Sequence, residues 1–203
     1  MNIDLRHLYT TLRDQLGPVG HWWPHESRTE QAVGAVLVQQ NRWEAAAASV
    51  AALRDHDLLD PDRLAAATPA EVAVSIRRSG LVRAKSAALP ALGRWMAEHE
   101  TEAESWSDEE LNDSLWSLPL VGPETADVIA LYGYARPRFV ADAYARRLLS
   151  ALGREVPRSY EATRRALDAA WTAAEMTAEE AAEFHGLIVE HGKRGLPTPW
   201  MEG

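Results

Sequence analysis

Asp142 is the residue of this 203-residue chain whose type and setting most directly suggest chemistry. It lies in the sequence Phe-Val-Ala-Asp-Ala-Tyr (139–144), directly before a segment with helical spacing that extends to about residue 152. A carboxylate fixed at such a place can stabilise positive charge that develops on a reacting atom. Aspartate is also one of the commonest N-caps of helices. The residues alone therefore leave Asp142 with both a catalytic and a structural interpretation.

A group of tryptophans could either stack on a flat ring or fill the hydrophobic core. Trp22 and Trp23 are adjacent and are followed by Pro24, and Trp43 lies downstream. A tryptophan face attracts a desolvated cation by about 1–2 kcal/mol. Each tryptophan could also fill a hydrophobic core, but two adjacent tryptophans in a proline-bounded loop are less typical of a core. We expect Trp22 or Trp23, together with Pro24 and Trp43, to line a pocket for a planar ring.

The third chemical feature is a tight turn in the sequence Leu-Pro-Leu-Val-Gly-Pro (118–123). Pro119 is expected to end one helix, and Pro123 suits the first position of the next. Gly122 is expected to permit a backbone turn that other residues resist. The start of the second helix presents backbone N–H groups and the positive end of a helix dipole. Such an end is suited to binding a phosphate group.

The charge of the chain is unevenly distributed. A net charge of −9 argues against nonspecific binding to nucleic acid, which requires neutralisation of phosphates. However, residues 76–95 contain five basic residues and no acid, and residues 136–158 contain six arginines against two acids. Residues 97–127 contain ten acids and neither lysine nor arginine. This segregation permits nucleic-acid binding on one face, although separate solvated helix surfaces would give the same pattern.

The composition argues against several classes of protein. The chain has no apolar run of 18 residues and no signal-peptide pattern at its start, so we expect a cytoplasmic protein without a membrane span. Because it has no cysteine, it can form neither a disulfide nor a cysteine-ligated zinc or iron–sulfur site. No histidine or acidic set has the spacing of a metal site. His185, beside Phe184 on an expected helix, is interpreted as a core or pocket-wall residue.

The elements that must position these residues are almost all expected to be helices. Apolar residues recur at helical spacing, and no segment shows convincing strand alternation. Capping boxes at 27–30 and 107–110 and Asp-Pro or Thr-Pro pairs at 60–61 and 68–69 indicate helix starts, and Thr-Ala-Glu-Glu (177–180) begins the last expected helix. The expected helices cover approximately residues 5–16, 27–37, 43–54, two short segments that begin at 61 and 69, 83–99, 107–118, 123–132, 142–152, 159–174 and 177–191.

The turn and the aspartate segment together resemble a known family. Leu-Pro-x-Val-Gly-x-x-Thr-Ala-Asp (118–127), followed by Phe-Val-x-Asp-x-Tyr (139–144), is similar to the helix-hairpin-helix and catalytic aspartate loop of the endonuclease III-type DNA glycosylases. Segments 21–44, 76–85 and 183–189 resemble further family blocks. The Trp-Trp-Pro loop and the lack of cysteine look most like the monofunctional 3-methyladenine DNA glycosylases without an iron–sulfur cluster.

The resemblance implies an all-α fold with two helical lobes and a DNA cleft between them. One lobe would be residues 23–134, including the helix-hairpin-helix at 108–132; the other would combine 1–22 with 135–203 and carry the aspartate loop. The implied function is base excision repair, in which the N-glycosidic bond of an alkylated base such as 3-methyladenine is hydrolysed after base flipping. The implied partner is double-stranded DNA with a damaged base, and we expect a monomer, associated with the nucleoid if bacterial.

The resemblance also implies roles for individual residues. Asp142 would be the catalytic carboxylate, and the tryptophan group would bind the flipped base. Gln39 and Leu81 occupy the places of side chains that fill the gap left by that base. The residues that would bind DNA phosphates are Gly122, Glu124 and Thr125 through backbone N–H groups, with Arg78 and Lys85.

Two departures from the family pattern concern the hairpin. Bifunctional members place a lysine where this chain has Glu124, and the amine of that lysine attacks the sugar to form a Schiff base. The chain should therefore release bases without cleaving the strand. Leu120 replaces the usual glycine, which leaves the strength of phosphate binding open.

The resemblance also bears on cofactors and leaves other functions open. The only cofactor implied is a structural Na⁺ or K⁺ ion at the hairpin, bound by the backbone carbonyls of Trp116, Leu118 and Val121. Two alternative functions remain. One is a family glycosylase for an oxidised or deaminated base, and the other is a non-catalytic helix-hairpin-helix DNA-binding protein.

Overall fold

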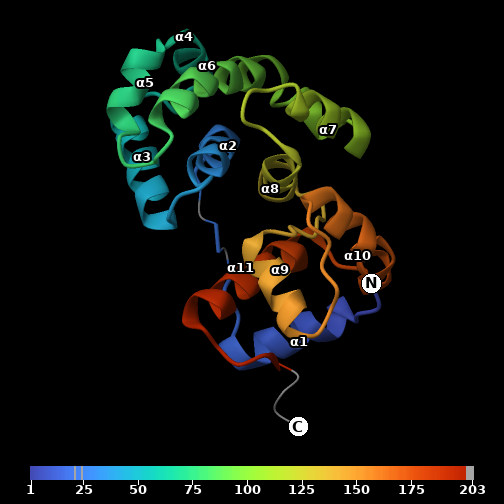
Figure 1. Ribbon diagram of the computed structural model, residues 1–203. Coiled ribbons are helices and arrows are strands. Elements are labelled where there is room, and N and C mark those ends of the chain that lie inside the picture. Colours follow the sequence, from blue (N-terminus) through green and yellow to red (C-terminus); the bar gives the residue numbers. More distant parts are fainter. Residues whose placement is uncertain (21, 24, 200–203) are drawn as a thin grey trace. The chain divides into compact units, whose positions relative to one another are not determined.

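The computed structural model describes residues 1–20, 22–23 and 25–199, and these residues form an all-helical protein (Figure 1). Over this part of the chain there are eleven α-helices, one 3-10 helix and no strand, which confirms the all-α prediction. None of these helices is long and apolar enough to cross a membrane. The α-helices are α1 (Leu5–Leu16), α2 (Arg28–Leu37), α3 (Trp43–Asp55), α4 (Pro61–Ala66), α5 (Pro69–Ser75), α6 (Val82–His99), α7 (Asp108–Trp116), α8 (Pro123–Tyr134), α9 (Ala143–Ala151), α10 (Tyr160–Ala174) and α11 (Ala178–Arg194).

Helix starts follow the capping signals in the sequence. Complete capping boxes open α5, α7 and α11. At α2 the hydroxyl of Ser27 accepts the N–H of Glu30 at 3.1 Å, but the Glu30 carboxylate binds Arg54 at 2.7 Å instead of completing the box. Local sequence therefore determines where a helix begins, whereas packing decides the partner of a side chain that can reach two.

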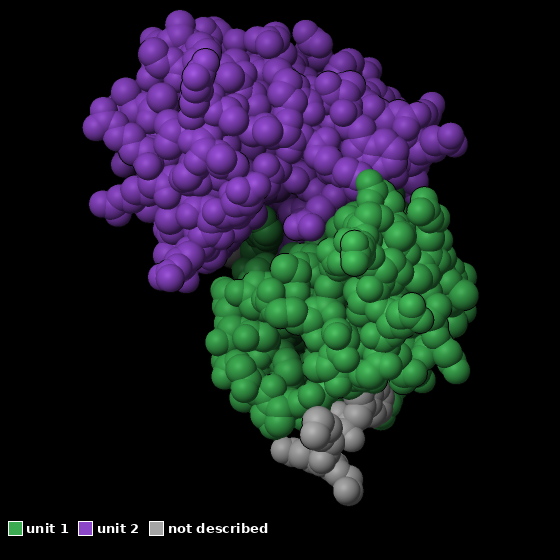
Figure 2. All heavy atoms as spheres, in the orientation of Figure 1, with its two compact units in different colours: residues 1–23, 135–203 green, residues 24–134 purple. Residues whose placement is uncertain are grey.

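The chain divides into two compact units, shown in different colours in Figure 2. Unit 1 comprises Met1–Trp23 and Ala135–Gly203, and unit 2 comprises Pro24–Tyr134. Trp23 belongs to unit 1 in this division, whereas the sequence-based boundary places it at the start of the other lobe. Each unit has its own buried core.

The core of unit 1 is built on α11, which packs against α1 and α9. The apolar side of α1 meets both phenylalanines of the chain and the apolar residues of α9. At the edge of this core the hydroxyl of Tyr9 donates to the Glu183 carboxylate at 2.5 Å, and burial together with this contact raises the pKa of Tyr9 to about 12. The largest buried core residues include Leu5, Leu8, Leu12, Phe139, Leu148, Leu149, Phe184, Leu187 and Ile188.

Helix α2 is the central helix of unit 2. It is buried from Thr29 to Leu37 and packs against α3, α6 and α8. A buried helix must be apolar or have its polar groups hydrogen-bonded. The buried amide of Gln31 meets this need only in part, because its Nε2 donates to the Val128 carbonyl at 3.3 Å whereas its Oε1 has no hydrogen-bond partner among the described residues. Around it, α4 and α5 pack against α6. The loops that follow α2, α5 and α7 carry Gln39, Arg78 and the hairpin residues that the sequence predicts to contact DNA.

Candidate functional site

Asp142 serves as a helix cap and retains a second carboxylate oxygen for other contacts. Its Oδ1 accepts the N–H of Ala145 at 2.8 Å and so caps α9. Its Oδ2 lies 3.8 Å from Nε2 of His185 on α11. The Asp142 side chain is 16% exposed, and that of His185 is 6% exposed. The structural and catalytic interpretations are therefore compatible, because one oxygen caps the helix and the other lies beside His185 in a side chain that is partly exposed.

Trp22 forms a wall beside this pair. Its ring centroid lies 5.5 Å from that of His185, with the two planes at 73°. The indole N–H donates to Glu190 at 3.2 Å, and the Lys193 ammonium lies 5.5 Å from the ring centroid. Gly186 allows the close approach of α11, because a Cβ there would lie 2.6 Å from Cγ of Trp22. Residues of α11 thus hold Trp22 in one orientation.

The other predicted pocket residues differ from Trp22. Trp23 is only 5% exposed and meets Trp22 edge to face at 6.3 Å, so it has little surface to offer a ligand. Trp43 is the first residue of α3 in unit 2 and is half-buried. Pro24 lies outside the described residues. Within unit 1 it is therefore Trp22 that lies, through His185, close to Asp142.

In unit 2 the side chain of Gln39 joins the loop after α2 to the hairpin. Its Nε2 donates to the Leu120 carbonyl and to the Thr125 hydroxyl, both at 2.7 Å. The hydroxyl of Thr125 is therefore held by a protein side chain. Leu81, the second predicted wedge residue, is the N-cap residue of α6, at the end of the loop after α5. Its side chain is 48% exposed. Both predicted wedge residues lie on loops whose backbone is fixed by hydrogen bonds.

The hairpin between α7 and α8 turns at a residue that the sequence did not indicate. Leu120 has a φ of +64°, whereas Gly122 is not among the residues with positive φ, which corrects the expectation for Gly122. Left-handed backbone at a residue with a Cβ costs roughly 1–2 kcal/mol. The Leu118 carbonyl accepts the N–H of Val121 at 3.2 Å and closes the turn. Because α8 begins at Pro123, its first-turn N–H groups face the hairpin.

Lys85 is buried, which corrects its predicted role in binding phosphate. It has no exposed surface. Its Nζ donates to the carbonyls of Leu37, Gln39 and Ser79 at 2.8, 2.8 and 2.6 Å. Burial lowers the pKa of this ammonium from its ordinary value of 10.5. Arg78, by contrast, is exposed and is available to a phosphate.

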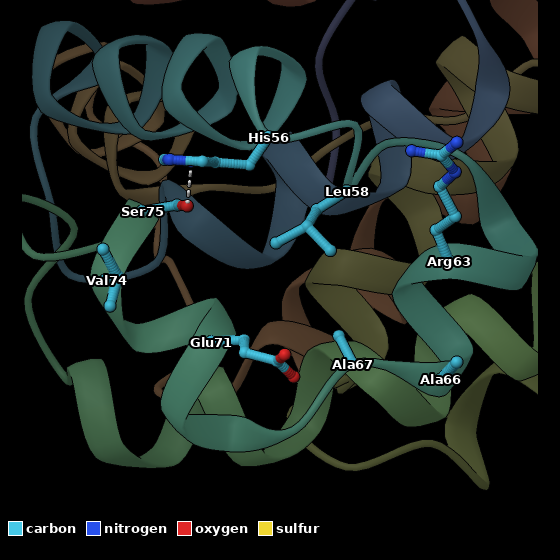
Figure 3. A pocket seen from close by; sticks show the side chains of 8 residues that line it. All are labelled: His56, Leu58, Arg63, Ala66, Ala67, Glu71, Val74 and Ser75. Atoms are coloured by element: carbon cyan, nitrogen blue, oxygen red, sulfur yellow. Dashed lines mark hydrogen bonds between the residues drawn. The ribbon is translucent and has the colours of Figure 1, made fainter.

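A separate pocket of about 580 Å³ lies among α3, α4 and α5 (Figure 3). Nδ1 of His56 lies 2.8 Å from the Ala52 carbonyl and 2.9 Å from the Ser75 hydroxyl. Because a carbonyl can only accept, Nδ1 carries the proton. None of the predicted site residues that the structure describes lines this pocket. Over the described residues, no group of three or more His, Asp or Glu side chains is placed to bind a metal ion.

Sequence reasoning missed the contacts of α11 with Trp22. His185 was expected as a core or pocket-wall residue, and its contact with Asp142 was not foreseen. The sequence does not indicate that Glu190 and Lys193 contact Trp22. Trp22 lies 168 positions before Glu190 in the chain. A pair so distant in sequence cannot be found from local spacing.

Comparison with known proteins identifies relatives of the whole arrangement. A family model described as HhH-GPD superfamily base excision DNA repair protein matches residues 33–173, which include the hairpin and Asp142. A candidate DNA repair glycosylase of Methanocaldococcus jannaschii is 32% identical over 193 residues, which are 92% of this chain and 86% of the relative.

Solved structures show the same fold. The H. pylori 3-methyladenine DNA glycosylase bound to 1,N6-ethenoadenine has a TM-score of 0.78 and 25% identity, over 96% of this chain and 99% of that one. A trapped endonuclease III–DNA covalent intermediate has a TM-score of 0.76 at 19% identity, over 96% and 88% of the two chains. The latter likeness is one of fold alone.

Proposed function

The chain belongs to the HhH-GPD superfamily of base excision DNA repair proteins, and from this premise we propose that it is a monofunctional DNA glycosylase for alkylated bases. Its substrate would be double-stranded DNA containing a base such as 3-methyladenine. The observation that carries the proposal is the Asp142 carboxylate, which caps α9 with one oxygen and lies beside His185 with the other. The likeness to the H. pylori 3-methyladenine glycosylase supports this substrate class.

In the proposed reaction the C1′–N bond breaks and its electron pair leaves with the base. Positive charge then develops on the sugar, and Oδ2 of Asp142 stabilises it electrostatically. Water forms the new C1′–O bond and releases a proton. A base methylated at a ring nitrogen is cationic and leaves as a neutral molecule, so the reaction requires no strong general acid.

Trp22 is the proposed base-stacking residue of unit 1. A cationic base gains more from an indole face than a neutral base does, which would select alkylated bases. The Lys193 ammonium also lies over the Trp22 ring, but Glu190, 3.5 Å from Lys193, partly neutralises that charge. We retain Pro24 and Trp43 as proposed base contacts, whereas Trp23, which is only 5% exposed, would support Trp22 and not contact the base itself.

The loops of unit 2 are proposed to grip the DNA. The backbone N–H groups of Gly122, Glu124 and Thr125 would bind a phosphate at the start of α8, with Arg78 binding another. Gln39 and Leu81 would fill the space left by the flipped base.

The hairpin is also the proposed site of a Na⁺ or K⁺ ion, held by the backbone carbonyls of Trp116, Leu118 and Val121. The Leu118 carbonyl accepts one hydrogen bond and keeps a second lone pair, which is compatible with an ion at this place. When bound, the ion would supply positive charge near the phosphate.

The test is incubation of the protein with methylated duplex DNA, followed by chromatography of the released bases. Release of 3-methyladenine supports the proposal. Release of only uracil or an oxidised pyrimidine would instead favour a glycosylase for another lesion. DNA binding without release of any base would favour a non-catalytic DNA-binding protein.

The proposed lack of strand cleavage has its own test. Glu124 stands where bifunctional members carry the lysine nucleophile, and a carboxylate cannot form a Schiff base. Borohydride treatment during the reaction should therefore yield no covalent protein–DNA product. A trapped product would contradict the monofunctional assignment.

A further inference from the structure

The buried ammonium of Lys85 joins two loops of unit 2 through backbone carbonyls. The Leu37 and Gln39 carbonyls belong to the end of α2 and the loop after it, and the Ser79 carbonyl belongs to the loop before α6. The three N–H donors of an ammonium match these three acceptors in number. The single ammonium of Lys85 therefore connects the two loops by hydrogen bonds.

The burial of this charge has a physical explanation. An ammonium buried away from water is unfavourable unless its donors are satisfied. Leu37 is the last residue of α2, so the ammonium also lies at the negative end of the α2 dipole. An apolar residue in place of Lys85 would leave buried carbonyls without a partner, which is itself destabilising. The site is thus built for a cation.

The two loops are strained next to the residues that Lys85 holds. Gln40 has a φ of +51° and Leu81 a φ of +46°, and each lies within two residues of a carbonyl bound by Lys85. Left-handed backbone at such residues persists only where the surroundings enforce it, and it is concentrated at functional sites. The side chain of Asn41 provides a second tie, because its Nδ2 donates to the Arg78 carbonyl at 3.2 Å.

We propose that Lys85 is a positioning residue that holds the loop backbone at Gln39 and Leu81 in the conformation from which their side chains enter the DNA duplex. It has no exposed surface and does not itself contact DNA. The inference rests on the proposed function, because it assigns Lys85 a role in base flipping. It also connects the hairpin, since the Gln39 side chain binds the Leu120 carbonyl while the Gln39 carbonyl binds Lys85.

The test compares Lys85→Met with Leu53→Ala. Leu53 is fully buried in α3 of the same unit and lies outside these two loops, so its truncation serves as a control for a general loss of stability. Excision of an alkylated base is measured from a fully paired duplex and from one in which the lesion faces an abasic site. In the second substrate the lesion has no pairing partner, so extruding it costs less free energy.

Lys85→Met should lose excision from the paired duplex by about tenfold more than from the unpaired one, because only base flipping depends on the wedge residues. Leu53→Ala should change both rates equally. An equal loss for both substrates in Lys85→Met would overturn the inference and leave Lys85 with a merely structural role.

A second measurement does not depend on catalysis. Amide hydrogen exchange without DNA should be faster at residues 38–41 and 79–81 in Lys85→Met than in Leu53→Ala. Unchanged exchange in these loops would refute the positioning role. If the wild-type protein released no base from any duplex, the proposed function would fail, whereas the exchange result would still decide whether Lys85 holds the loops.

Discussion

The two units place different kinds of chemical group at their candidate functional residues. In unit 1 the groups are side chains: the Asp142 carboxylate, the His185 imidazole and the Trp22 ring, arranged around α11. In unit 2 they are largely backbone groups, which Lys85 and Gln39 hold in strained loops. A change of a single functional group should therefore impair unit 1 without disturbing its fold. In unit 2 the same result requires a change in the backbone or in what supports it.

The largest effect that would sharpen this comparison is expected from Asp142→Asn. Asparagine still caps a helix, so the midpoint of thermal unfolding should hardly change. Loss of the negative charge should reduce base release under single-turnover conditions by roughly 10³-fold. The matched control is Asp60→Asn, because Asp60 caps α4 in the same way, accepting the N–H of Arg63 at 3.0 Å. Base release within threefold of the wild type would remove Asp142 from the catalytic role.

Gly186→Ala tests whether the position of Trp22 matters to unit 1. The new Cβ would lie 2.6 Å from Cγ of Trp22, so the ring must move. A shift of about 1 Å in a positioning group can reduce a rate by roughly 10²-fold, and we expect a loss approaching this for 3-methyladenine release.

The matched control for that change is Gly133→Ala on α8. A Cβ there meets only the Gln31 side-chain oxygen, at 3.2 Å. Both substitutions raise helix propensity by about 1 kcal/mol, so a difference in base release between them reports the displacement of Trp22. Equal activity of the two variants would show that Trp22 does not contribute to the reaction.

The raised pKa of Tyr9 predicts that the free energy of unfolding falls at high pH, independently of base release. The pKa of Tyr9 is raised to about 12 in the folded protein, so the folded state keeps the proton that the unfolded state loses near pH 10. The stabilisation is complete below pH 10 and is lost as the pH rises through 12. It amounts to at most about 2–3 kcal/mol.

Denaturant unfolding at pH 9 and pH 11.5 measures this term. The wild type should lose more unfolding free energy between the two pH values than Tyr9→Phe, which has no phenolic proton. An identical loss in both proteins would show that another group titrates. Base release at pH 7.5 should be similar in the two proteins, because the Tyr9 hydroxyl binds Glu183 and not Asp142 or His185.

The smallest effect is expected at the hairpin of unit 2. Leu120→Gly relieves a φ of +64° but increases the entropy of the unfolded chain, so the net gain in unfolding free energy should be at most about 1 kcal/mol. Leu118→Gly is the control, because Leu118 is not among the residues with positive φ and should only lose stability. Thermal unfolding of both variants measures the difference. A lower midpoint in Leu120→Gly would mean that the contacts of the leucine side chain outweigh the backbone strain.

Much of the fold could be predicted because its signals are local. The N-cap residues Ser107 and Thr177 bind residues three positions later, and such patterns are visible in a short stretch of sequence. Leu120 and Lys85 could not be read in this way. The left-handed conformation of Leu120 depends on how α7 meets α8, and Lys85 on α6 reaches carbonyls 46 and 48 positions earlier in the chain.

The sequence by itself determined the all-α class, the helix starts, the position of Asp142 before α9 and the absence of a lysine at Glu124, because each depends on residue type and short-range spacing. Only the tertiary structure decided which tryptophan lies near Asp142 and that Lys85 faces inward. Both outcomes depend on packing between segments that are distant in the sequence. Lys85, which the sequence suggests as a phosphate ligand, is buried and instead binds backbone carbonyls of two loops.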